Sequence, residues 1–213
     1  MMTDQMKKTV WAALPAGVLG LCGVTHASST DPGPKDLSRA VKAFLVEHGD
    51  LCMAKYTWPR DITEGDADVD KNDVVQLPVL EHLGLVRSVD VANPTGPTKR
   101  YSLTDKGQRY FLKKRHTTLG AHDTVAEHDA DFCVAHLSLD KVVKWSPPEP
   151  VHDHLETVVR YTYHVEAADW MSDPEARQAF PIADRIIRGQ GVMLMNATVA
   201  LRNGKWVPVL PGQ

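Results

Sequence analysis

The start of the chain has the pattern of an export signal, which removes residues 1–27 from the folded protein and sets the redox environment of the rest. Lys7 and Lys8 precede an uncharged apolar run that is too short and too interrupted by Gly and Pro to span a bilayer well. The run ends on Thr25 and Ala27, small residues at the two positions that signal peptidase reads. The sequence therefore predicts a signal peptide cleaved after Ala27 and a periplasmic or secreted mature protein.

Export to an oxidising compartment would favour a disulfide between the remaining cysteines. Of the three cysteines in the chain, Cys22 leaves with the signal, and Cys52 and Cys133 remain. A lone pair in an oxidising compartment has one intramolecular partner choice, so a Cys52–Cys133 disulfide is expected. No later apolar run is long enough for a transmembrane helix, and the mature chain is expected to contain none.

Residues 28–115 are expected to form an N-terminal module of helices and short strands. Apolar residues at helical spacing after Asp36 predict a first helix that Gly49 ends, and residues 51–59 read as a strand. An acidic loop at 61–73 then leads into a second helix and a strand at Leu85. The remaining predicted elements are a hairpin over 87–103, with Asn93–Pro97 at its tip, and a last helix over 104–115.

The stretches "LEHLGLVRSVDV" and "TKRYSLTDKGQRYF" resemble the distal half of small bacterial winged-helix repressors, over residues 80–111. The resemblance implies a winged-helix-like fold for the N-terminal module. A DNA-reading member of that family has a short positioning helix, and this chain has a strand and an acidic loop in its place. The helix in the reading position carries Pro78, Val79 and Leu80 in place of side chains that reach base edges, so no specific DNA binding is expected.

Basic residues follow that helix and form a candidate partner-binding patch. The patch consists of Arg87, Lys99, Arg100 and Arg109. Such a cluster is a phosphate-binding signature when taken alone. In an exported protein with a formal net charge of −3, it can equally face the acidic loop. Both interpretations, an external anion and the protein's own carboxylates, stay open at this point.

The acidic loop resembles a calcium-binding loop in part. Asp66, Asp68 and Asp70 take its first, third and fifth places, but Lys71 and Leu77 stand where the turn Gly and the bidentate Glu belong. We therefore expect a solvated loop that caps the next helix through Asn72 or Asp73.

Histidines are unusually frequent in and after the linker at 116–131, which is also rich in Asp. The candidate metal ligands are His122, His128, His152 and His154. A His-x-His pair on a strand or loop aims both imidazoles to one side, which suits Zn²⁺ or Cu²⁺. The alternative is a polar linker with scattered histidines and no cofactor.

Residues 132–213 are expected to form a second module, a small antiparallel sheet packed on a helix. Strands are predicted over 132–145 and 155–166, and a helix over 169–180 with Ser172 or Asp173 as its cap. Asn203-Gly204 between apolar alternations is a strong hairpin signal. The order is similar to ligand-cupping, cystatin-like sheets. The predicted fold class is α+β, with a winged-helix-like module followed by this sheet domain.

The chain contains none of the sequence motifs of serine hydrolases, zinc peptidases or P-loop enzymes. The leading hypothesis is thus an exported, non-catalytic accessory protein of the bacterial envelope that binds a partner or ligand, as an inhibitor or immunity-type factor does. The first alternative is a metal-binding protein or a metal-dependent hydrolase that uses the His/Asp-rich linker. The second is a DNA-binding regulator whose signal is misread.

Overall fold

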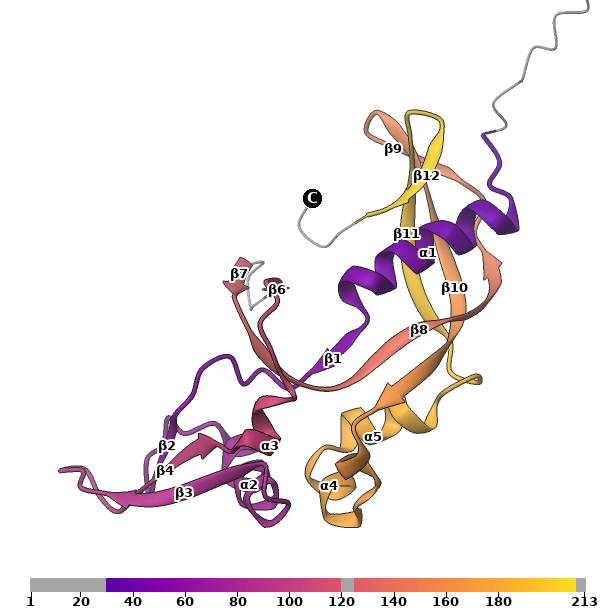
Figure 1. The fold of residues 1–213 in the computed structure, drawn as a ribbon. Helices are drawn as coiled ribbons and strands as arrows, with labels where there is room; N and C mark the ends of the chain where they lie inside the picture. Colours follow the sequence, from indigo (N-terminus) through magenta and orange to yellow (C-terminus); the bar gives the residue numbers. More distant parts are fainter. Residues whose placement is uncertain (1–29, 120–124, 210–213) are drawn as a thin grey trace, which may run out of the picture.

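The computed structural model describes residues 30–119 and 125–209, and these fold as an α+β protein around a curled antiparallel sheet (Figure 1). Within those residues the sheet has seven strands, with the order β1-β8-β10-β11-β12 along its main path. β5 also pairs with β8, and β9 with β10. The bounds are β1 Asp50–Cys52, β5 Phe111–Leu112, β8 Asp131–Trp145, β9 Glu149–Val151, β10 His154–Ala167, β11 Met195–Arg202 and β12 Lys205–Pro208.

The strands of this sheet confirm the patterns that predicted them. Along β10, the buried side chains include Val159, Tyr161 and Tyr163, at every second position of the predicted alternation. β11 and β12 are joined at Asn203 and Gly204, whose φ angles of 51° and 72° are both positive. A two-residue hairpin turn of this kind requires positive φ at both positions, which Asn and Gly adopt most readily.

The helix that covers the sheet comes from the N-terminal part of the chain. Helix α1, Pro34–His48, lies across β10 and β11 in Figure 1. Its buried residues Leu37, Val41 and Leu45 share a core with the inward side chains of β10, β11 and β12. The prediction of a sheet packed on a helix is thus fulfilled by α1, and not by the helix expected over 169–180.

A second, three-stranded sheet follows α1 in the chain. Its strands β2 Arg60–Thr63, β3 Val86–Val91 and β4 Thr98–Leu103 have the order β2-β4-β3. Helix α2, Lys71–His82, lies between β2 and β3 in the sequence and buries Leu77 and Leu80 against the sheet and its neighbours.

Two elements of this region are shorter than predicted. The strand expected over 51–59 ends at Cys52, and the backbone N–H groups of Ala54 and Lys55 donate to the Asp131 side chain and not to a neighbouring strand. The helix expected over 104–115 is only α3, Asp105–Gln108, since the chain turns directly into β5 to pair with β8.

Each of the two hydrophobic cores combines early and late parts of the chain. The core around α1 is described above. The other core joins α2 and the small sheet to Phe132 of β8 and to a late segment of the chain. That segment comprises the short helix η2 Asp169–Ser172, α4 Pro174–Ala179 and α5 Pro181–Arg188. Asp173 caps α4 as predicted, accepting hydrogen bonds from the backbone of Glu175 and Ala176. The early helix therefore packs on the late sheet, and the late helices pack on the early module.

The expected linker also has structure. Strands β6 His116–Leu119 and β7 Val125–His128 pair as a separate hairpin. Among the described helices, none combines the length and apolar character that crossing a bilayer requires.

Candidate docking surface on helix α2

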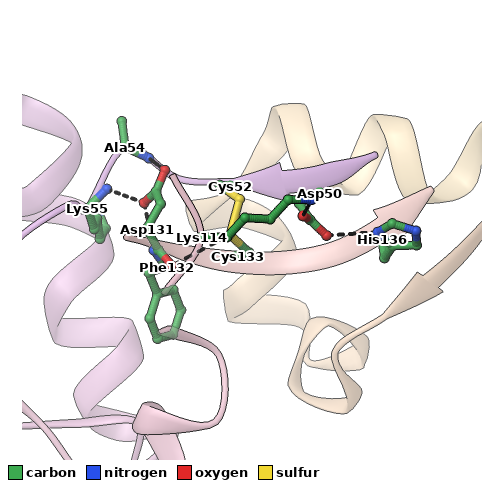
Figure 2. The surroundings of a disulfide bond; sticks show 9 residues. All are labelled: Asp50, Cys52, Ala54, Lys55, Lys114, Asp131, Phe132, Cys133 and His136. Carbon is green, nitrogen blue, oxygen red and sulfur yellow. Dashed lines mark hydrogen bonds and ion pairs between the residues drawn. A yellow bond between two sulfur atoms is a disulfide. The ribbon is translucent and has the colours of Figure 1, made fainter. Parts of the chain in front are cut away.

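The predicted cysteine pair is disulfide-bonded where β1 meets β8. Cys52 and Cys133 face each other in this ladder, with 3.8 Å between their Cα atoms. Figure 2 shows Asp50 beside the bond, between Lys114 and His136. Partial burial raises the pKa of Asp50, but the hydrogen bonds from His136 at 2.8 Å and Lys114 at 2.9 Å outweigh it and leave the pKa below its ordinary value.

A buried ion cluster joins Lys55, Arg60 and Asp73. The Lys55 ammonium, on a side chain that is 1% exposed, donates to Asp73 Oδ1 at 2.6 Å. Arg60 Nε donates to the second oxygen of the same carboxylate, also at 2.6 Å. The predicted cap of α2 through Asn72 or Asp73 is wrong: Asp70 is the cap and accepts from the Asn72 N–H, and Asp73 lies inside the first turn of the helix.

The predicted metal ligands do different things in the structure. His128 stacks on Tyr56, with ring centroids 3.4 Å apart. His152 occupies the turn between β9 and β10 with a φ of 54°, and His122 lies outside the described residues. In residues 30–119 and 125–209, no group of three or more His, Cys, Asp or Glu side chains is close enough to hold a metal ion.

His154 is held by carboxylates on both sides. Its Nδ1 lies 3.0 Å from Asp153 and its Nε2 lies 2.7 Å from Glu156. The hydrogen bond with Asp153, and then that with Glu156, raises the pKa of His154 above its ordinary value. Both ring nitrogens donate only in the imidazolium form, so the arrangement favours the charged ring.

This arrangement predicts a pH-dependent stability. Because the folded pKa is raised, the contribution of His154 is fully present below its unfolded pKa of about 6.5 and is lost as pH rises through the folded value. The melting temperature of the wild type is therefore expected to fall slightly relative to His154→Asn as pH rises from about 6 to about 8. Thermal melts of both proteins across this range measure the effect. Parallel melting curves at every pH would contradict it.

The candidate basic patch is divided among three places. The register of β3 and β4 puts Arg87 and Arg100 on one face of the small sheet and Lys99 on the other. Arg109 lines a separate pocket beside β8. Arg100 meets Asp61 of the acidic loop through two hydrogen bonds of 2.7 Å, which lower the pKa of that carboxyl. For Arg100, the protein's own carboxylate is the partner.

Helix α2 carries apolar side chains on its exposed side as well as on its buried one. One face carries the buried Leu77 and Leu80. The other presents Val74, Val75 and Pro78, a set we call the α2 stripe, and its two valines are 49% and 57% exposed. Helices at a protein surface normally turn polar side chains to solvent, so the exposed apolar α2 stripe is a candidate interaction surface.

Pro78 adds a polar feature to the α2 stripe. In an α-helix, the carbonyl of residue 74 accepts its hydrogen bond from the N–H of residue 78. Proline has no N–H, so Pro78 cannot donate to the Val74 carbonyl. The Val74 carbonyl therefore lacks its usual intrahelical donor.

A groove of about 370 Å³ continues the α2 stripe at Val74. The acidic loop, the tip of the β3–β4 hairpin and the start of α2 enclose it. Its lining combines aliphatic and charged side chains: Ile62, Val69, Val74, Glu64, Asp66, Asp90 and Lys99. The volume lies in the range of ordinary ligand sites in proteins.

Sequence reasoning noted the apolar character of this helix only as an argument against DNA binding. The unbroken run from Leu77 to Leu80 was the available signal. It could not show which face would be buried, since that depends on α4, which follows about a hundred residues later and packs on α2.

The comparisons with known proteins add nothing to the geometry: no family model, no curated protein and no solved structure matches this chain.

Proposed function

We propose that this chain is an exported, non-catalytic accessory protein of the bacterial envelope that binds another protein through the α2 stripe. The observation that carries the proposal is the exposed face of α2, where two valines and a proline stand next to a groove. Burying an aliphatic side chain of this size contributes roughly 1.5–3 kcal/mol, so a few such contacts suffice to anchor an interface.

Two further features support a role outside the cytoplasm. The Cys52–Cys133 bond fits an oxidising compartment. The export signal predicted over residues 1–27 lies outside the described residues, so it remains part of the proposal. Inhibitors and immunity-type factors are accessory proteins of this kind, which act by covering part of a partner.

The proposal also includes the winged-helix-like character of the N-terminal module. It is supported by the order of the small sheet, β2-β4-β3, with α2 placed before the β3–β4 hairpin. In a DNA-binding member of that family the helix at this place reads base edges with polar side chains. Here the same position carries the aliphatic α2 stripe, which favours a protein partner over a duplex.

The proposal predicts a specific loss of binding. Val75→Asp places a charge in the centre of the α2 stripe and is expected to weaken capture of the partner from an envelope fraction at least tenfold. Val46→Asp is the matched control, because Val46 is 64% exposed on α1. Both variants should melt close to the wild type, since neither removes a buried side chain. Equal capture by all three proteins, measured by quantitative mass spectrometry, would end the proposal.

A further inference from the structure

We propose that the groove beside α2 binds a segment of the partner that carries Lys or Arg side chains next to an aliphatic one. This inference rests on the docking function proposed above and adds the chemistry of the partner. The groove offers an aliphatic wall and a set of carboxylates at one place, and the two together select this kind of segment.

The charge of the groove is the first argument. Glu64, Asp66 and Asp90 are exposed in its lining, against the single cation of Lys99. Within the described parts of the chain, none of these three carboxylates forms an ion pair, whereas Asp61 and Asp73 nearby are both paired. Three unpaired negative charges in a hollow attract cations and repel nucleic acid.

The spacing of the carboxylates is the second argument. Two of them come from the acidic loop and one from β3. Among residues 30–119 and 125–209 no acidic or histidine side chains are grouped closely enough to hold a metal ion, and this applies to these three carboxylates as well. Carboxylates that are too dispersed to share one ion can each accept from a separate ammonium or guanidinium group. Arg and Lys also bring aliphatic stems that pack on apolar walls such as Ile62, Val69 and Val74.

The edge of the small sheet is a less suitable place for the same segment. An extended peptide would pair with β3, the strand at one edge. At the middle of that strand, however, the Ser88 N–H already donates to Glu81 Oε1 at 2.7 Å. The Glu81 side chain of α2 thereby occupies one of the β3 donors that an added strand would use, which makes this edge less favourable than the groove.

A hexapeptide library tests this inference without knowledge of the partner. The peptides vary Lys, Glu, Ser and Leu at every position and are offered to the mature chain with its disulfide intact. We expect Lys and Leu to be enriched, and the enrichment to weaken as salt is raised. The variant Glu64→Gln/Asp66→Asn/Asp90→Asn should lose it at least tenfold. The control Glu47→Gln/Glu149→Gln/Glu175→Gln makes the same charge change at exposed positions outside the groove and should keep it.

The outcomes separate this inference from the docking function. Enrichment that is absent, or that persists in the groove variant, overturns the inference. If Val75→Asp still abolishes capture of the partner in that case, the docking function stands without it. If Val75→Asp and the groove variant both capture as the wild type does, both proposals fail.

Discussion

Asp73→Asn is expected to lower the free energy of unfolding by about 3–5 kcal/mol. The Asp73 side chain is 4% exposed and pairs with two cations, Lys55 and Arg60. Asparagine fills the same volume but leaves the Lys55 ammonium, which is 1% exposed, without a counter-charge in a low-dielectric setting. Urea unfolding of residues 28–213 with the disulfide intact measures the loss.

Two comparisons isolate the cause of this loss. Asp61→Asn breaks the pair with Arg100, whose members are 39% and 46% exposed, and should cost only about 0–1 kcal/mol. Adding Lys55→Met to Asp73→Asn removes the orphaned charge and should recover a large part of the loss. A loss below about 1 kcal/mol for Asp73→Asn would show that the cluster is not a buried ion pair in solution.

Cys52→Ala/Cys133→Ala is expected to cost about 4 kcal/mol. The bond closes a loop of 81 positions, and a cross-link of that span restricts the unfolded chain by about this amount in the chain-entropy model. It also ties β1 to β8 at the place where the core around α1 and the core around α2 adjoin. The loss should thus affect the whole unfolding transition and not one end of the chain.

Reductant provides the control for the disulfide. Reduction should shift the urea midpoint of the wild type to that of the double alanine variant and leave the variant itself unchanged. Counting thiols in the denatured, unreduced protein gives an independent reading. Free thiols at both Cys52 and Cys133 would contradict the bond.

Local sequence signals predicted the local structure well. The Asn203-Gly204 turn, the alternation in β10 and the cap at Asp173 each depend on a few neighbouring residues, and all three are present. The Cys52–Cys133 bond could be predicted from the expected oxidising compartment, because each of the two cysteines has only one possible partner there. Each of these features depends either on neighbouring residues or on a single possible pairing, so it can be predicted from one sequence.

Local sequence signals could not predict that the early helix α1 packs on the late sheet, or that the late helices pack on the early module. Helix α1 is amphipathic, and its apolar face could pack on any apolar surface. Nothing in residues 34–48 indicates that this surface is the sheet formed by the late part of the chain. Lys55 reads as an ordinary surface lysine until Asp73 and Asp131 are placed around it. The α2 stripe was missed for the same reason, since a helix that is apolar on both sides reveals its free face only after the other one is packed.

Photo-crosslinking from the α2 stripe shows whether this face of the helix contacts an envelope protein. A photoreactive phenylalanine derivative is placed at position 75 or, as the matched control, at position 46 of α1, and the cells are irradiated before fractionation. We expect one discrete envelope-protein adduct from position 75, none from position 46, and loss of the adduct when Pro78→Asp is added. Adducts that are equal at the two positions, or absent from position 75, would contradict the proposed docking function.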